Sequence, residues 1–306
     1  MSALKTRVWR VLLTRATPHN SAARLALPFS SYAACRFLDF PPVNPRNLHL
    51  HLTKNPFAGQ PPHLCGVTQE TGETTIRYDN ICPAIFRERL NRFVARVELD
   101  GREERVHVRN TGRCAELLVP GNRVWLTGSG NPARKTRFDL VAVEKRTPEG
   151  PRLVNMDSLA PNRAAGEWLA AGGLGHWTNL RAEATIGDSR FDFAAEENGR
   201  RVVAEVKGCT LEEGGVARFP DAPTLRGLKH VRGLQALAEG GARCVLLVVI
   251  QMKGVSLFRP NWQTQPEFGQ ALLNARAAGV EIVAMDCETA PGMVRIDRPV
   301  EVRLEQ

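Results

Sequence analysis

The stretch RFDFAAEENGRRVVAEVKG, residues 190–208, sets charged side chains inside two otherwise apolar runs. Asn198–Gly199 separates the runs, and an Asn-Gly pair is the strongest short signal for a two-residue β-turn. Pairing about that turn sets Asp192 directly opposite Glu205. The stretch therefore predicts a β-hairpin that carries two facing carboxylates.

The other face of this hairpin is apolar. The same register sets Phe193 opposite Ala204 and Phe191 opposite Val206, and Val202 shares their face. Five apolar side chains on one face are suited to packing against helices, so the hydrophobic pattern supports the register that the turn predicts.

Opposed carboxylates need compensation. Their Cβ atoms lie about 4.5–5.5 Å apart, and like charges at that spacing are destabilising. A divalent cation offsets them, because Mg²⁺ binds one or two carboxylates together with phosphate oxygens. Lys207 follows Glu205 on the same face and can orient a water or stabilise a phosphate. Asp192, Glu205 and Lys207 are therefore predicted catalytic residues of phosphodiester cleavage with Mg²⁺ or Mn²⁺. The alternative is a solvated strand face.

Helices are predicted on both sides of the hairpin. Residues 161–171 form the first, and its Glu167 is the predicted third metal ligand beside Asp192 and Glu205; the alternative is an ordinary exposed carboxylate. Residues 224–239 form the second, where three basic side chains at i, i+3 and i+4 share a face that can bind phosphates: Arg226, Lys229 and His230. A solvated basic face and a structural histidine are the alternatives.

The remainder of this half alternates helix and strand. A buried strand is expected at 244–252, a helix at 266–278 that ends before Gly279, and a strand at 280–288. This order predicts an α/β arrangement with one mixed sheet flanked by helices.

Residues 83–148 are rich in short strands. Asp100–Gly101 predicts a hairpin that sets Ala95 opposite Val106 and Phe93 opposite Val108 on an inward face. The outward face carries basic side chains, of which three are predicted to bind nucleic acid: Arg92, Arg105 and Arg109. Several strands in a short segment predict a small OB-like β-barrel, and residues 147–152 are expected to be a linker after it.

Residues 1–78 differ from the rest. Up to Gln69 the only acidic residue is Asp39, and prolines interrupt any periodicity. We expect a disordered extension or upstream sequence from a misplaced start, although the composition is also typical of a transit peptide. The predicted domains are thus 1–78, an OB-like domain over 79–148 and a nuclease-like domain over 149–306.

The basic excess is confined to the first half. Residues 1–82 hold 9 basic and 4 acidic side chains, residues 83–150 hold 14 and 9, and residues 151–306 hold 18 and 19. A regional excess favours a polyanion such as DNA as partner; a solubilising surface is the alternative. Seven scattered cysteines without a C-x-x-C pair indicate a reducing, cytoplasmic location without a zinc site. No run of about 18 apolar residues occurs, so no membrane association is expected.

Asp192 followed by Glu205-x-Lys207 on a hairpin resembles the PD-(D/E)xK nuclease superfamily. The stretch EVKGCTLEEGGVARFPDAPTLRGLKHVRGL, residues 205–234, resembles the signature of the sugar fermentation stimulation protein family. NTGRCAELLVPG at 110–121 is similar to its amino-terminal motif, and PNRAAGEWL, SRFDF and AGVEIVA are similar to further parts. Cys114 and Arg96 depart from the pattern, which otherwise covers about 83–290.

That resemblance implies an OB-like first domain, a restriction-endonuclease-like second domain, DNA binding and a link to sugar metabolism. Nuclease action is implied only by the superfamily. We therefore expect a DNA-binding protein, without sequence preference, that has a metal-dependent nuclease-like site. The alternatives are a non-catalytic DNA-binding regulator with a relic metal site, and an enzyme for a small phosphate ester, which needs a closed pocket. No stable protein partner is indicated, and the oligomeric state is left open.

Overall fold

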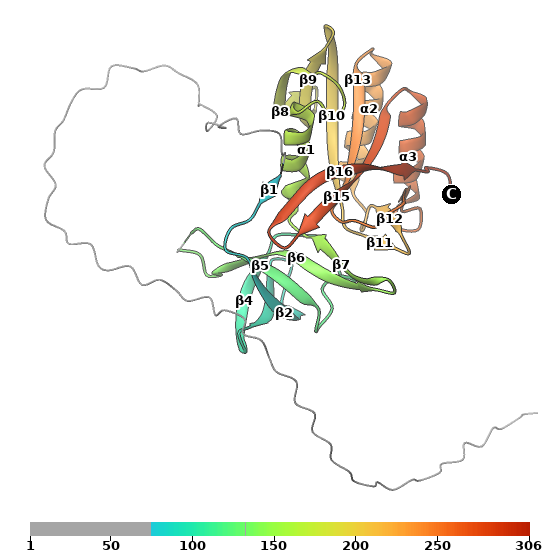
Figure 1. Ribbon diagram of the computed structural model, residues 1–306. Helices are drawn as coiled ribbons and strands as arrows, with labels where there is room; N and C mark the ends of the chain where they lie inside the picture. Colours follow the sequence, from blue (N-terminus) through green and yellow to red (C-terminus); the bar gives the residue numbers. More distant parts are fainter. Residues whose placement is uncertain (1–74, 132) are drawn as a thin grey trace, which may run out of the picture. The chain divides into compact units, whose positions relative to one another are not determined.

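The computed structural model describes residues 75–131 and 133–306, which form two β-sheets and three helices (Figure 1). Of the extension predicted over residues 1–78, residues 1–74 lie outside this range. No helix in the described part of the chain is long and apolar enough to cross a membrane.

The first sheet is a barrel. Its strands are β2 (Cys82–Arg89), β3 (Val94–Leu99), β4 (Arg102–Val108), β5 (Arg123–Gly128), β6 (Phe138–Thr147) and β7 (Gly150–Asn155). Their order is β4-β3-β2-β5-β6-β7, and parallel pairing of β4 with β6 closes five of them into a ring. Closure removes the exposed edges of the sheet. The OB-like prediction is confirmed.

The predicted hairpin in this barrel has the expected register. Asp100 and Gly101 have φ values of 50° and 75°, as a two-residue turn of type I′ requires, and Ala95 pairs with Val106. Phe93 lies opposite Val108 as predicted, since the Val108 amide donates to the Phe93 carbonyl at 2.8 Å, but its predicted place on the inward face was wrong, because its side chain is 51% exposed.

The predicted linker at 147–152 is instead a hairpin turn. β6 and β7 pair from Thr147↔Gly150 to Ala142↔Asn155, so the barrel sheet continues to Asn155. Gly150 has a φ of 120°, a conformation open to glycine, which lets the chain reverse there. The domain boundary thus lies several residues beyond the one predicted from the Pro- and Gly-containing sequence.

The second sheet is mixed, as predicted. Its strands are β1 (Ile76–Arg77), β8 (Thr178–Ile186), β9 (Ser189–Glu197), β10 (Arg200–Cys209), β11 (Glu212–Glu213), β12 (Val216–Phe219), β13 (Arg243–Ile250), β14 (Leu257–Pro260), β15 (Glu281–Ala290) and β16 (Met293–Val302). The order is β11-β12-β14-β16-β15-β13-β10-β9-β8, with β1 paired to β16. β10, β13 and β15 run parallel at the centre, and β9 joins β10 antiparallel.

Three helices lie close to their predicted positions: α1 (Ala160–Ala170), α2 (Leu225–Glu239) and α3 (Pro266–Ala277). α2 begins where the Thr224 side chain accepts a hydrogen bond from the Gly227 amide at 2.9 Å, which caps one free donor. Pro161 and Pro266 occupy the first turns of α1 and α3, where the absence of an N–H costs nothing.

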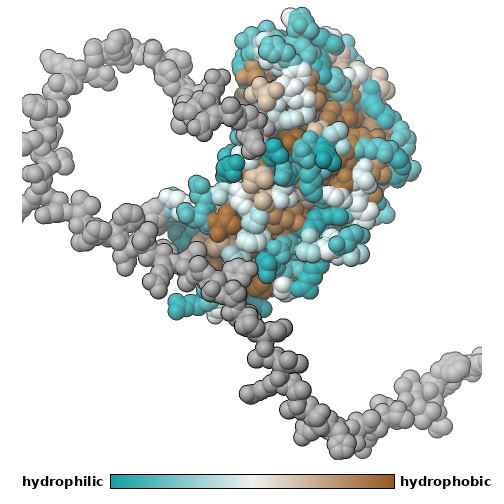
Figure 2. Space-filling view, viewed as in Figure 1, coloured by the Kyte–Doolittle hydropathy of each residue, from teal (hydrophilic) through white to brown (hydrophobic). Residues whose placement is uncertain are grey.

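The helices cover opposite faces of the central strands. Val245, Leu247 and Val249 of β13 lie in a cluster with α1, whereas Cys244 and Leu246 lie in a cluster with α2 and α3. This alternation is the period of a strand. Val248 and Ile250 join the barrel residues in a third cluster, so the barrel and the second sheet share a core. On the face shown in Figure 2, hydrophilic side chains dominate and apolar ones show between them.

The second sheet begins earlier than predicted, within the segment expected to be an extension. Ile76 pairs with Val294 of β16, is 1% exposed and packs in the cluster beside α1. The Tyr78 hydroxyl donates to Asp157 Oδ2 at 3.1 Å, which ties the same segment to the loop before α1. Residues 76–78 are therefore part of the folded core.

We expect Ile76→Ala to lower the free energy of unfolding by about 2–5 kcal/mol, the range for truncating a buried isoleucine. Denaturant unfolding of the purified protein measures this. Leu225→Ala is the control, because Leu225 is 82% exposed and its truncation should change stability by less than about 0.5 kcal/mol. Equal effects of the two substitutions would contradict the placement of β1.

Candidate active site

The site lies where β9 and β10 separate. The predicted register is confirmed from Arg200↔Glu197 to Ala204↔Phe193, where the antiparallel ladder ends. The Val206 amide then donates to Asp192 Oδ2 at 2.8 Å. A side-chain oxygen thus accepts the hydrogen bond that a partner strand would accept, and it holds Asp192 against β10.

The separation of the strands also changes the apolar face. Phe193, Ala204 and Val206 share the cluster with α1, as predicted for one face. Phe191 lies instead in the cluster with α2 and α3, so its assignment to that face, and its pairing with Val206, were wrong.

Glu205 is the most buried charged group of the site, at 2% exposure. Its Oε1 accepts hydrogen bonds from Lys207 Nζ and from His230 Nδ1. Its Oε2 is buried and has no hydrogen-bond partner among the described residues. A buried carboxylate oxygen without a partner is costly, so a cation at Oε2 would remove a real penalty.

His230 belongs to the support of this carboxylate. Its side chain is buried, and its ring lies 5.8 Å from that of Phe191. Because an ionised carboxylate only accepts, Nδ1 carries the proton of the shared hydrogen bond. The prediction that His230 faces phosphates together with Arg226 and Lys229 was wrong: those two are exposed, and His230 faces the sheet.

Asp192 is half-buried beside Glu205. Burial raises the pKa of the Asp192 carboxyl above its usual value, and the neighbouring Glu205 charge raises it further; the Val206 amide, Lys207 and Asn162 act in the opposite direction. Asn162 Nδ2, in the first turn of α1, donates to Asp192 Oδ1 at 2.6 Å. Each oxygen of Asp192 therefore keeps one lone pair for a further ligand.

Glu167 does not join the two acids. It lies on an exposed part of α1, and within residues 75–131 and 133–306 no three His, Cys, Asp or Glu side chains form a metal-binding group. α1 contributes Asn162 instead, about one turn nearer its start. Asn162 was not predicted, although it stands in the motif PNRAAGEWL at the start of the helix, where short polar side chains are common.

The predicted barrel arginines fall into two kinds. Arg109 is paired: its guanidinium lies 3.3 Å from Oδ2 of the fully buried Asp157. Arg92 and Arg105 are exposed, and neither makes an ion pair with another described residue. Arg92 and Arg105 thus remain exposed without a charged partner in the described part of the chain, whereas Arg109 is engaged with Asp157.

The second-domain cations also differ. Arg226 is exposed near the start of α2, while Lys229 donates from Nζ to the Asp188 carbonyl at 2.7 Å, in the β8–β9 turn. A lysine bonded to a carbonyl keeps its charge and two further donors. Both remain accessible to a phosphate.

The carboxylate pair fits a divalent metal. Asp192 and Glu205 offer the hard oxygen donors that Mg²⁺ and Mn²⁺ take. The unpartnered Oε2 of Glu205 and the raised pKa of Asp192 are both features that a cation would relieve. Asp192, Glu205 and Lys207 are brought together; their roles in a reaction stay predictions.

We expect Asp192→Asn to stabilise the metal-free protein by about 0.5–2 kcal/mol at neutral pH. Because the pKa of Asp192 is raised in the folded state, the folded protein loses stability as the pH rises above the pKa that this aspartate has in the unfolded chain. Asparagine carries no charge and removes that loss, and its side-chain oxygen can still accept the hydrogen bond from the Val206 amide. Thermal unfolding in EDTA across pH measures this. The gain should vanish below the usual aspartate pKa.

Asp157→Asn is the matched control, since Asp157 is buried but ion-paired with Arg109. That substitution should destabilise the protein. A destabilising Asp192→Asn would show that its charge is already compensated without a metal.

Comparison with known protein families covers both domains. The family model described as "SfsA N-terminal OB domain" matches residues 88–156. The model described as "Sugar fermentation stimulation protein RE domain" matches residues 159–293. Together these ranges include most of the barrel, α1 and every candidate site residue.

Individual proteins are similar over the same region. A sugar fermentation stimulation protein homolog of Ruminiclostridium cellulolyticum is 47% identical over 230 residues, which cover 75% of this chain and 100% of that protein. A homolog of Desulfitobacterium hafniense strain DCB-2 is 45% identical over 229 residues, 75% of this chain and 99% of that protein. The solved structure of Pyrococcus furiosus SfsA in complex with Ca²⁺ matches with a TM-score of 0.67 and 28% identity, over 74% of this chain and 98% of that chain. The chain therefore belongs to the sugar fermentation stimulation protein family.

Proposed function

We propose that this protein binds DNA without sequence preference and cleaves phosphodiester bonds with Mg²⁺ or Mn²⁺ held by Asp192 and Glu205. The single observation that carries the proposal is the buried Oε2 of Glu205, which has no partner among the described residues and lies beside a second carboxylate. A cation bound there would activate water and stabilise charge on the phosphate.

The protein's own residues have separate tasks in this proposal. Asn162 and the Val206 amide hold Asp192 in place through hydrogen bonds of 2.6 and 2.8 Å. His230 fixes Glu205. Lys207, whose side chain is 13% exposed, stands beside the carboxylates where it can orient the attacking water.

The structure of a related protein supports the proposed metal binding. The similar structure from Pyrococcus furiosus was solved in complex with Ca²⁺. Ca²⁺ and Mg²⁺ are both hard cations that prefer oxygen ligands, although they differ in size and coordination number. We infer that the acidic pair of this chain binds the same class of ion.

DNA binding is supported by the charges that remain free. Arg92 and Arg105 on the barrel and Arg226 on α2 are exposed and unpaired within the described residues. Phosphate contacts by arginines are independent of sequence and depend on salt. Such contacts are the basis of the proposed lack of sequence preference.

A second candidate is a DNA-binding regulator without catalysis, linked to sugar metabolism through the family name. It is favoured by the occupied Oε1 of Glu205, which Lys207 and His230 already bind, and by the lack of a third acid in the described site. In that case Lys207 would neutralise a relic carboxylate. Strand scission distinguishes the two candidates.

We expect Asp192→Ala to reduce Mn²⁺-dependent cleavage of DNA by more than about 100-fold, because even loss of an outer-shell partner costs a metal site about 10–100-fold. Gel analysis of single- and double-stranded DNA measures cleavage, and a filter assay measures binding, which should stay close to wild type. Glu167→Gln is the control, and it should cleave normally because Glu167 is not grouped with the acids. Wild-type cleavage by Asp192→Ala would refute the assignment. Binding without scission by the wild-type protein would favour the regulator.

For DNA affinity, we expect Arg92→Ala and Arg105→Ala each to weaken binding equally for different sequences. Each should lower the slope of log K against log salt by about 1, since one phosphate contact is lost. Arg109→Ala should instead lower the unfolding temperature, because it leaves the buried Asp157 without its cation. Salt titrations and thermal unfolding of the three variants measure this. An unchanged salt slope in both exposed variants would exclude this barrel face from the DNA interface.

A further inference from the structure

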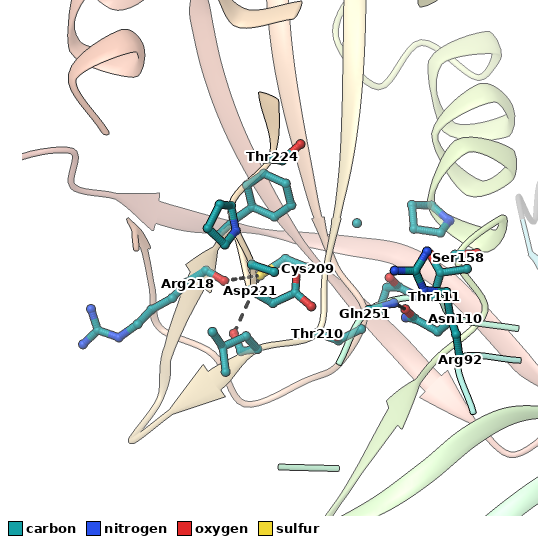
Figure 3. Close-up of a pocket in the computed structure, with 17 residues that line it drawn as sticks. Arg92, Asn110, Thr111, Ser158, Cys209, Thr210, Arg218, Asp221, Thr224 and Gln251 are labelled. Carbon is teal, nitrogen blue, oxygen red and sulfur yellow. Dashed lines mark hydrogen bonds between the residues drawn. The ribbon is translucent and has the colours of Figure 1, made fainter. Parts of the chain in front are cut away.

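A cleft of about 400 Å³ lies between the barrel and the second domain (Figure 3). Its barrel wall is the loop Asn110–Gly112 together with Arg92, and the facing wall is formed by Thr210 and the segment 221–224. The volume is in the range of small-molecule sites. No sequence pattern indicated this pocket, because its walls are loops that are far apart in the chain.

The barrel wall is built rigidly. The guanidinium of Arg89 donates five hydrogen bonds to backbone carbonyls, at 2.6–3.2 Å. Three of these carbonyls belong to residues 110, 112 and 113, and the others to 91 and 92. Every donor of this arginine is used, so the loop at the cleft is fixed to the β2–β3 turn.

The facing wall is fixed as well. Asn261 Nδ2 donates to the Pro220 carbonyl at 3.0 Å, and the Thr224 amide donates to Gln265 Oε1 at 2.9 Å. Gln251, which also lines the cleft, is 2% exposed and donates from Nε2 to Asn155 Oδ1 of the barrel sheet at 3.0 Å. A cleft whose two walls are held by hydrogen bonds is preorganised for a ligand.

Two opposite charges line the cleft and stay apart. Arg92 lies on the Ser158 side in Figure 3 and Asp221 on the Thr210 side. Within the described residues, neither side chain forms an ion pair or a hydrogen bond. The Arg218 guanidinium points away from the cleft and lies 3.7 Å from Glu213. One cation and one carboxylate thus remain for a ligand that has an anionic end and a hydrogen-bond-donating end.

The cleft borders the candidate metal site at two points. Pro161 lines the cleft, and the next residue, Asn162, holds Asp192. Gly208 lines the cleft, and the preceding residue is Lys207. A Cβ at Gly208 would lie 2.6 Å from Pro161 Cγ, so a glycine keeps this border open. A ligand in the cleft would therefore adjoin a phosphate at the metal site.

We propose that this cleft binds one unpaired nucleotide of the DNA strand, with its phosphate on Arg92 and its base edge on Asp221. The inference rests on the proposed DNA function. A carboxylate accepts two parallel hydrogen bonds from the N1–H and N2–H of guanine, which makes guanine the preferred base at this one position, while the phosphate contacts along the rest of the strand stay independent of sequence. That edge is available only when the base is unpaired, so the strand must be single or locally open. The hydroxyl and amide side chains around the cleft suit the sugar.

The test uses the full chain in EDTA, with dGMP and dIMP as probes in calorimetric titrations. dIMP lacks only the N2 amino group of guanine. We expect dGMP to bind about tenfold more tightly than dIMP, the effect of one hydrogen bond to a charged group. Asp221→Asn should weaken dGMP binding by about tenfold or more and remove the preference over dIMP. Single-stranded oligothymidylates that carry one guanine should likewise bind more tightly than those that carry one hypoxanthine. This result distinguishes a site for a nucleotide within a DNA strand from a site that takes free nucleotides only.

Three variants complete the design. Glu213→Gln, on an exposed carboxylate that does not line the cleft, should bind dGMP like wild type. Thr111→Trp should block binding by filling the cleft; if it does not fold, the Asp221→Asn comparison decides. Asp192→Ala should bind dGMP normally. Equal affinity for dGMP and dIMP in the wild type, no binding at millimolar nucleotide, or an unchanged dGMP affinity in Asp221→Asn overturns the inference. If dGMP affinity falls in Asp221→Asn as expected but the wild-type protein cleaves no DNA, the nuclease function is refuted and the assignment of the cleft stands.

Discussion

The hydrogen bond from the Val206 amide to Asp192 Oδ2 governs the arrangement of the site. β9 and β10 form a regular ladder only up to Ala204↔Phe193, and beyond it an unpaired amide of β10 needs an acceptor. An aspartate supplies one at 2.8 Å, and as a charged acceptor it makes a stronger bond than a carbonyl would. The fold thereby gains a satisfied backbone group, and the site gains a carboxylate fixed next to Glu205 although burial opposes its charge.

Glu205 depends on the helix that covers its face of the sheet. It stands in β10 opposite Leu246 of β13, where a carboxylate has no access to bulk water. The Thr224 cap sets the start of α2, and one and a half turns later His230 reaches Oε1. Oε1 of Glu205 accepts two hydrogen bonds, whereas Oε2 accepts none from the described residues. A purely structural ion pair would be expected to satisfy both oxygens, so this asymmetry favours a ligand at Oε2.

Local signals predicted the parts of the fold that depend on neighbouring residues. The turns at Asp100–Gly101 and Asn198–Gly199 set their registers because both dipeptides accept positive φ. Strands β8 and β16 were missed, since β8 is largely exposed and β16 contains Pro299, so neither shows a clean apolar pattern. Contacts between residues that are far apart in the chain could not be predicted from the sequence either. The replacement of Glu167 by Asn162 depends on the angle at which α1 meets the hairpin, and a pattern of residue types does not contain that angle.

The contacts between the two domains determine whether the cleft keeps a fixed width. Glu212 of the second domain is 2% exposed and accepts a hydrogen bond from Lys145 Nζ of the barrel at 2.7 Å. Burial acts to raise the pKa of Glu212, but the hydrogen bonds from Lys145 and the Gly215 amide outweigh it, and the pKa is lowered. This ion pair therefore stabilises the join at neutral pH and weakens as pH falls through the lowered pKa. With the core that the barrel and sheet share, it opposes hinge motion. A cleft held open in this way selects its ligand by shape and charge rather than by closing around it.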